Sequence, residues 1–184
     1  MSSSTSRIPL SEYARLNARE PVDLRRFRDS LGLFASGITV IAGYDGEPLG
    51  FTCQSFYSVS VDPPLVSFSV MATSSSYPRI RETGKFSVNV LSKRQQAISN
   101  RFARKGSEKW AGVAWTTAAT QSPVIDGALM WLDCEIRAEH AAGDHTIVIG
   151  EVLATGLNDG KDAEPLLYYR GSYRHLSKPD GSAA

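Results

Sequence analysis

Apolar and polar residues alternate with a period of two along much of the chain, which is the pattern of β-strands with one buried face. Strands are predicted in this way at residues 38–42, 49–51, 56–61, 86–91, 129–139 and 146–157. Further extended stretches are predicted at 65–70, which is apolar on both faces, and at 166–169 and 173–176. The turns between them are predicted at Asp45-Gly46, Asp62-Pro63-Pro64 and Gly143-Asp144-His145. The chain is therefore expected to consist mainly of antiparallel hairpins.

Three shorter segments carry helical spacing instead. The first helix is expected to begin at Asp23, which is able to cap it, and to stop at Gly37. Its apolar face consists of Leu24, Phe27, Leu31 and Phe34. Two more helices are expected, one at residues 77–83 that ends at Gly84 and one at residues 94–102.

Many antiparallel strands with a few short helices predict a mainly β protein with a closed or nearly closed barrel; an α+β sandwich is the alternative. Residues 103–122 are weakly patterned and predict a long loop with some helix. At 184 residues the chain is expected to form one domain. This domain is predicted to span residues 21–177, between a flexible arm at 1–20 and a disordered tail at 178–184.

The composition excludes several classes of function. The apolar fraction of 42% and the charged fraction of 21% are ordinary for a globular protein. Twenty basic and nineteen acidic residues nearly cancel, which argues against a nucleic-acid partner. No apolar stretch is long enough to span a membrane, and the Ser-rich start lacks the apolar core of a secretory signal. A cytoplasmic location is therefore expected.

The two cysteines are too far apart in sequence to predict a disulfide framework or a zinc site. Cys134 falls on the apolar face of its strand and is expected to be a small buried residue. Cys53 lies among small polar residues, where a reactive thiol is conceivable. No cationic neighbour in the sequence lowers its pKa, so the inert interpretation is favoured.

The chemistry is concentrated in the run from Gly50 to Val66. Small hydroxyl and amide side chains lie here between two apolar strands, and such a surface can bond the edge of a flat heteroaromatic ring. A solvated edge hairpin is the structural alternative. The run, with its Ser-Val-Ser-Val-Asp-Pro-Pro segment at 58–64, resembles the signature of short-chain flavin reductases.

Four further motifs have both a functional and a structural interpretation. Residues 73–76, Thr-Ser-Ser-Ser, form an anion site or simply cap a helix. Arg101-Phe102 supplies a phosphate clamp, or a solvated cation beside a core ring. His145 in the Gly-Asp-His turn is a ligand contact or a structural histidine. The aromatic run 168–173 stacks on a ring, or forms a core or dimer cluster.

Residues 24–176 resemble the flavin reductase family with these motifs in the same order. The resemblance implies a Greek-key split β-barrel that forms a homodimer. It implies cofactor contacts at Thr52, Cys53, Gln54, Ser55, Ser58, Val59, Thr73, Ser74, Ser75, Ser76, Arg101 and Phe102. It implies nicotinamide contacts at His145 and Tyr173, no certain catalytic residue and no metal. Many relatives have Ala or Asn where this chain has Cys53 and Gln54, which weakens the transfer of side-chain roles there.

The implied activity is an NAD(P)H-dependent flavin reductase. Hydride passes from the nicotinamide, with NADH as the preferred donor, to FMN or FAD, and the reduced flavin serves a partner oxygenase. The alternatives are a flavin-binding protein without turnover and an oxidase of the pyridoxamine-phosphate type. The sequence shows no Gly-x-Gly-x-x-Gly dinucleotide motif and no metal-ligand spacing among its three histidines.

Overall fold

The computed structural model describes residues 22–106, 108–158 and 163–176. The chain divides into two compact units, residues 1–34 and 35–184. In the first unit lies helix α2 (Leu24–Leu31), and the Asp23 carboxylate caps it by accepting from the backbone N–H groups of Arg25 and Arg26. The predicted arm at 1–20 and tail at 178–184 lie outside the described residues.

Helix α2 is shorter than the sequence pattern predicts. It ends at Gly32, where the backbone N–H closes onto the carbonyl of Arg28, and Gly37 belongs instead to strand β1 (Ser36–Gly37). The expectation of a helix reaching Gly37 was therefore wrong, because the chain turns out of the helix one residue after Leu31. The side chains of its apolar face are exposed, at 69% for Leu24 and 50% for Phe27.

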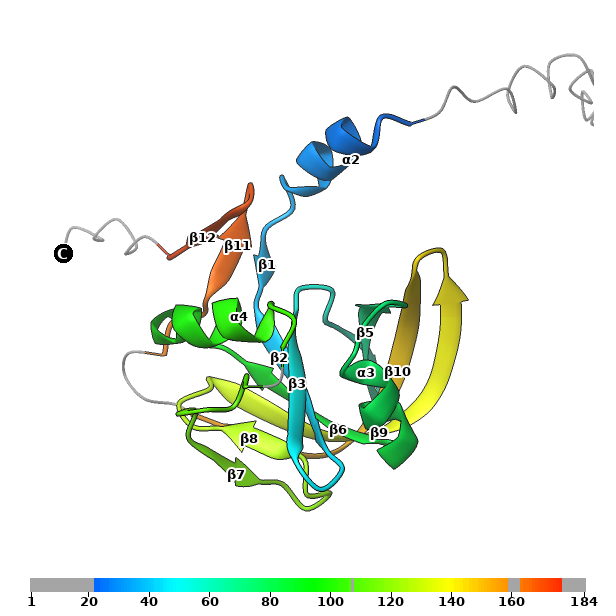
Figure 1. The fold of residues 1–184 in the computed structure, drawn as a ribbon, viewed down its shortest axis with the longest axis vertical. Helices are drawn as coiled ribbons and strands as arrows, with labels where there is room; N and C mark the ends of the chain where they lie inside the picture. Colours follow the sequence, from blue (N-terminus) through cyan, green and yellow to red (C-terminus); the bar gives the residue numbers. More distant parts are fainter. Residues whose placement is uncertain (1–21, 107, 159–162, 177–184) are drawn as a thin grey trace, which may run out of the picture. The chain divides into compact units, whose positions relative to one another are not determined.

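Seven strands of the second unit form one antiparallel sheet in the order β3-β2-β6-β9-β10-β5-β4 (Figure 1). Their bounds are β2 Thr39–Tyr44, β3 Pro48–Cys53, β4 Tyr57–Val61, β5 Pro64–Met71, β6 Lys85–Val90, β9 Met130–Ala142 and β10 His145–Leu157. The remaining elements are β7 Trp115–Thr117, β8 Pro123–Ile125, β11 Leu167–Tyr169, β12 Ser172–Arg174, α3 Tyr77–Thr83, the 3-10 turn η1 Lys93–Gln95 and α4 Gln96–Phe102. The predicted strands and the two later helices are confirmed.

The sheet curls so that β3, at one end of the strand order, comes next to β5 near the other end. No backbone ladder joins these two strands. The hydroxyl of Ser55, just after β3, accepts from the backbone N–H of Ser69 at 2.8 Å and donates to the Ser69 carbonyl at 3.0 Å. The Ser55 side chain thus takes the place of a paired peptide group where the predicted barrel closes, and the Cys53 thiol lies 3.8 Å from the same carbonyl.

The barrel encloses an apolar core built from the inward residues of alternating strands. Phe68 lies at its centre, in edge contact with Phe86 at 5.2 Å and with Tyr77 of α3 at 6.1 Å between ring centroids. A second cluster lies around Phe102 of α4; it is made of Ile38, Val40, Ala42, Leu91, Phe102, Ile125 and Leu166. Phe102 therefore joins α4 to the barrel wall.

The segment at 103–122 differs from its prediction, because it contains the strand of a short hairpin, β7–β8, and no helix within its described residues. Buried polar side chains of the barrel hold this hairpin. Asn89 accepts from the backbone N–H of Ile125 at 2.8 Å and donates to the carbonyl of Pro123 at 3.2 Å. The carboxylate of Asp133, fully buried, accepts from the backbone N–H of Thr120 at 3.0 Å. The loop's own residues carry no periodic signal of these contacts.

Gly150 offers a direct test of the barrel packing. It faces Phe86, and a Cβ atom there would lie only 2.4 Å from the Cζ atom of that ring. Gly150→Ala is therefore expected to lower the free energy of unfolding by about 1–3 kcal/mol through overpacking. Gly37→Ala, where a Cβ atom meets nothing within 4 Å, is the control. Equal denaturant midpoints for Gly150→Ala and the unmodified protein would contradict this packing.

Candidate functional site

Three chain segments that are distant in sequence meet at one end of the barrel. The Ser55–Ser69 hydrogen bonds bring the β3–β4 connection to β5. Met71 at the end of β5 pairs with His145 at the start of β10, and Ala72 donates its backbone N–H to the carbonyl of Asp144 at 2.9 Å. The predicted polar patch, the Thr73–Ser76 segment and the Gly-Asp-His turn are thus brought to the same region.

Within the polar patch, most small side chains already have a structural partner. The Thr52 hydroxyl donates to the carbonyl of Ser99 on α4 at 2.7 Å. The Ser55 hydroxyl is bonded to Ser69, and the Cys53 thiol lies 3.3 Å from the Ser55 oxygen. Gln54 is exposed between them. Its amide and the backbone groups of this connection are what the patch offers to a ligand.

Ser58 and Val59 lie on β4, the last strand in the sheet order, and both are exposed. Ser58 pairs with Val66 of β5, three residues before the Ser69 contact. A register shift between Ser58 and Ser60 leaves Val59 outside the ladder. Their predicted contacts with the cofactor stay predictions.

The hydroxyls at 73–76 play different parts from one another. The backbone N–H of Tyr77 donates to the Ser74 hydroxyl at 3.2 Å, so Ser74 caps α3. The Ser76 hydroxyl donates to the carbonyl of Gly50 on β3 at 3.3 Å and makes no capping bond. Thr73 and Ser75 are exposed. The structure thus supports the capping interpretation for Ser74 and leaves Thr73 and Ser75 facing outward.

Arg101 and Phe102 lie at the end of α4 and serve the fold directly. The Arg101 guanidinium donates to the carbonyl of Ala111 and holds the chain that follows the helix. Phe102 is 1% exposed and contacts Trp110 edge-on, with 4.8 Å between ring centroids. The alternative of a core ring therefore describes Phe102, while a phosphate contact by Arg101 stays a prediction.

His145 is partly exposed and oriented by its neighbour. Its Nδ1 atom lies 2.7 Å from the carboxylate of Asp144, which keeps that nitrogen as the donor in the neutral ring and leaves Nε2 free to accept a hydrogen bond. Gly143 occupies the turn with a φ of 67°, a left-handed conformation that glycine adopts at little cost. The predicted turn is present, and it carries the partly exposed His145.

Tyr173 belongs to a different part of the unit from His145. Its hydroxyl lies 2.9 Å from the Ser99 hydroxyl and donates to the side chain of Asn100 at 2.9 Å. Its ring contacts Tyr168 edge-on at 5.3 Å. Tyr173 therefore anchors the C-terminal hairpin to α4, and Ser99, which it contacts, is in turn bonded to Thr52 of the polar patch.

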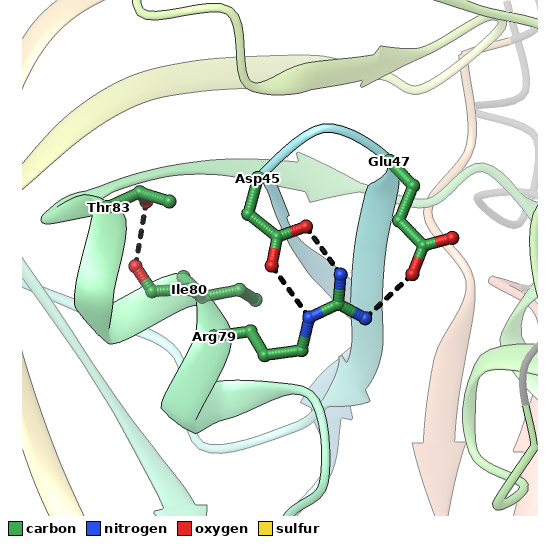
Figure 2. Close-up of polar contacts among 5 residues, drawn as sticks. All are labelled: Asp45, Glu47, Arg79, Ile80 and Thr83. Atoms are coloured by element: carbon green, nitrogen blue, oxygen red, sulfur yellow. Dashed lines mark hydrogen bonds and ion pairs between the residues drawn. The ribbon is translucent and has the colours of Figure 1, made fainter.

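A cavity of about 290 Å³, which no pattern in the sequence predicted, lies beside the predicted patch. The β2–β3 hairpin, the start of α3 and the segment around Lys109 and Trp110 line it. Figure 2 shows Arg79 of α3, which also lines it, bound by the carboxylates of Asp45 and Glu47. A Lys-Trp pair in a weakly patterned loop carries no periodic signal, so only the folded structure reveals it.

The donor set fits a flat cofactor with a polar edge and an anionic tail. Exposed amide and hydroxyl groups lie at one barrel end. The Lys109 ammonium and the unpartnered indole N–H of Trp110 lie beside them. Among the described residues no group of three or more His, Cys, Asp or Glu side chains is placed to hold a metal ion. No helix in that part of the chain is both long and apolar enough to cross a membrane.

Comparison with known proteins agrees with this site. The family model described as "Flavin reductase like domain" matches residues 31–177. The reductase subunit HsaB of a flavin-dependent monooxygenase from Rhodococcus jostii (strain RHA1) is 42% identical over 164 residues, which are 89% of this chain and 83% of that protein. The chain therefore belongs to the flavin reductase family.

Two solved structures share the split-barrel fold. Nitrilotriacetate monooxygenase component B from Mycobacterium thermoresistibile is 40% identical with a TM-score of 0.83, covering 88% of this chain and 91% of that chain. The NADH:FAD oxidoreductase SgcE6 of Streptomyces globisporus C-1027 is 32% identical with a TM-score of 0.80, covering 86% and 96%. The predicted family, fold class and enzyme class are confirmed.

The two thiols provide a test of the site's packing. Burial raises the pKa of the Cys53 thiol, and burial together with the Asp133 charge raises that of Cys134 to about 12. At pH 8 neither thiol of the folded protein is expected to react quickly with a disulfide reagent, whereas both react in denaturant. A raised thiol pKa also means that stability is full below the unfolded pKa of 9.0 and falls as the pH rises above it. Rapid labelling of Cys53 in the native state would contradict its burial.

Proposed function

We propose that the protein is an NADH-dependent flavin reductase whose flavin lies at the barrel end where the β3–β4 connection, residues 72–76 and the Gly143–His145 turn converge. The observation that carries this proposal is the convergence itself, in a chain of the flavin reductase family. Flavin, when bound, supplies the acceptor for the nicotinamide hydride. The chain contributes binding, orientation and shielding from water, and no protein base is required.

The flavin-facing groups are proposed from their exposure. Gln54, Thr73 and Ser75 are exposed side chains with hydrogen-bonding capacity at this end. The peptide groups around Gln54 lie beside them, since Ser55 ties this connection to β5. Donors placed at the polar edge of the flavin ring stabilise the charge that develops there on reduction. Thr52, Ser55 and Ser76 support these groups through their own bonds to the backbone.

His145 is proposed to contact the nicotinamide. Its Nε2 atom is left as an acceptor by the hydrogen bond between Nδ1 and Asp144, and it suits the amide N–H of a nicotinamide. The pairing of His145 with Met71 places it next to residues 72–76. Tyr173 supports the site from the side of α4 in this proposal, since its hydroxyl is engaged by Ser99 and Asn100.

The reduced flavin is proposed to serve a separate oxygenase, as the names of HsaB and of nitrilotriacetate monooxygenase component B indicate for those proteins. Both FMN and FAD remain candidates, and the cytoplasm is the proposed location. A flavin-binding protein without turnover and a pyridoxamine-phosphate oxidase are the alternatives that the assay below separates.

A homodimer is part of the proposal, with a second copy covering the apolar side chains of β4. Tyr57, Val59 and Val61 lie on this last strand of the sheet order and are 54%, 45% and 88% exposed. Exposed apolar side chains on an edge strand are typical of an interface. The aromatic run 168–173 supports the dimer less, since Tyr168 and Tyr173 contact each other within the chain. Light scattering is expected to give twice the chain mass of 20.0 kDa, and a monomer would contradict this.

The purified protein is expected to accelerate the oxidation of NADH by added FMN or FAD without any oxygenase. Anaerobic mixing, followed by the loss of visible flavin absorption, measures this directly and also ranks NADH against NADPH. Flavin without protein is the control. Tight flavin binding with a reduction rate equal to this control would favour the binding protein without turnover.

His145→Ala is expected to raise the KM for NADH and to lower kcat/KM about two- to tenfold, the worth of one hydrogen bond, while the flavin dissociation constant changes little. His140→Ala is the matched control, because His140 is exposed on the adjacent strand β9. A melting curve accompanies both variants. A lower melting temperature with both ligands affected together would mark His145 as structural.

A further inference from the structure

The sulfur-containing side chains of the described residues differ sharply in their exposure. Cys134 is fully buried and Cys53 is 5% exposed. Met130 is partly buried and packs against the barrel core. Met71, the last residue of β5, is 53% exposed. Among these four residues, Met71 is therefore the one whose sulfur a reagent from solution reaches most easily.

Met71 lies at the barrel end where the flavin site is proposed. It is the register partner of His145, the first residue of β10, in the antiparallel ladder that joins β5 to β10 (Figure 1). Register partners on adjacent strands present their side chains on the same face of the sheet, with Cβ atoms about 4.5–5.5 Å apart. The thioether of Met71 is thus a neighbour of the His145 imidazole.

The backbone of Met71 joins two parts of the same site. Its carbonyl accepts from the backbone N–H of Ser74 at 2.9 Å and so begins the turn that carries residues 72–76. The next residue, Ala72, donates its backbone N–H to the carbonyl of Asp144 at 2.9 Å. A chemical change at Met71 is therefore made between the hydroxyl segment and the turn that carries His145.

The proposed activity produces an oxidant for this sulfur whenever no oxygenase consumes the reduced flavin. Dioxygen then takes two electrons and two protons from the reduced flavin and becomes hydrogen peroxide. Hydrogen peroxide converts a thioether to a sulfoxide: the O–O bond breaks, an S–O bond forms and water leaves. The sulfur loses the two electrons that the peroxide gains, so the step is balanced without a further reagent.

The cysteines do not compete for this oxidant. A thiol reacts through its thiolate, and burial raises the pKa of the Cys53 thiol and that of Cys134. A thioether needs no deprotonation, so its reactivity depends on access to the sulfur. Exposure and chemistry therefore both favour Met71.

We propose that Met71 is an oxidation site at which hydrogen peroxide from turnover without an oxygenase modifies the protein and lowers its use of NADH. The inference rests on the proposed function, because the reduced flavin is the source of the peroxide. The sulfoxide replaces a flexible apolar group by a polar one with an acceptor oxygen. That oxygen lies beside His145, and two acceptors that present lone pairs to one ligand repel each other. The contact of His145 with the nicotinamide is therefore weakened.

The modification limits the waste of NADH. A reductase that works faster than its oxygenase releases peroxide, and the sulfoxide at Met71 slows that reductase. Reduction by a methionine sulfoxide reductase returns the thioether and with it the full use of NADH. Met71 is in this way a reversible sensor of the balance between the two proteins.

Peptide mass spectrometry after turnover locates the modification. The unmodified protein is mixed with NADH and FMN in air, and the oxygen gained at Met71 and at Met130 is followed with time. Met71 is expected to gain one oxygen atom well before Met130. Argon in place of air, and catalase added in air, are each expected to suppress the modification. Equal rates at Met71 and Met130, or an unchanged rate at Met71 under argon or with catalase, would overturn the proposal.

Hydrogen peroxide added to the protein without NADH separates the modification from turnover. After the peroxide is removed, the KM for NADH is expected to be raised about two- to tenfold, the worth of one hydrogen bond, with an unchanged flavin dissociation constant. Met71→Leu, which keeps a similar size and lacks the sulfur, is the matched variant, and its KM is expected to stay the same on treatment. Methionine sulfoxide reductase is expected to restore the KM of the oxidised protein.

An unchanged KM in a protein whose Met71 is fully oxidised would overturn the proposal, and so would an equal rise of the KM in treated Met71→Leu. Melting curves accompany both proteins. A lower melting temperature of the oxidised protein, with both ligands affected together, would assign the effect to lost packing and would also contradict the proposal. The proposed function is judged separately, by whether the untreated protein accelerates the oxidation of NADH by added flavin.

Discussion

The pair of hydrogen bonds between the Ser55 hydroxyl and the peptide of Ser69 is the contact on which the site depends. Strand β3 has no backbone ladder with β5, so side chains close the barrel there, chiefly the Ser55 hydroxyl, with the Cys53 thiol 3.8 Å from the same Ser69 carbonyl. The Ser55 hydroxyl also sets the position of Gln54 against the end of β5, and therefore against residues 72–76 and His145. A larger residue at position 55 would separate the strands, and an apolar one would leave the N–H of Ser69 unpaired.

The same use of a short side chain to join two elements explains why small hydroxyl residues occur throughout the site. Thr52 holds α4 through the carbonyl of Ser99, and Ser76 holds α3 through the carbonyl of Gly50. Each hydroxyl joins an element to β3 without the bulk of a longer side chain. The groups that remain for a ligand are peptide units, the exposed side chains nearby and the Lys109 ammonium. A surface of fixed dipoles with one cation suits a flat cofactor with an anionic tail.

Several features of the fold can be predicted from the sequence because they depend on residues that are close together in the chain. Period-two alternation locates the long hairpin of β9 and β10. Gly84 ends helix α3 with a φ of 69°, and Gly143 forms the turn of the hairpin with a φ of 67°. The end of α2 was misjudged, because the apolar spacing continues through Phe34 while the backbone leaves the helix at Gly32. The β7–β8 hairpin was missed because side chains of other strands, among them Asn89 and Asp133, hold it in place.

By itself the sequence determined the strand pattern, the family and the segments that carry the chemistry, since these depend on residues close together in the chain. Only the tertiary structure decided which of those side chains are free. Thr52 and Ser55 look like ligand contacts in the sequence, yet their hydroxyls are occupied by backbone carbonyls 47 and 14 residues away. Lys109 has no signal in its surroundings, and its place beside Gly50 arises from packing across 59 residues of chain. Contacts over such separations follow from how the barrel closes, and residue type or spacing does not encode them individually.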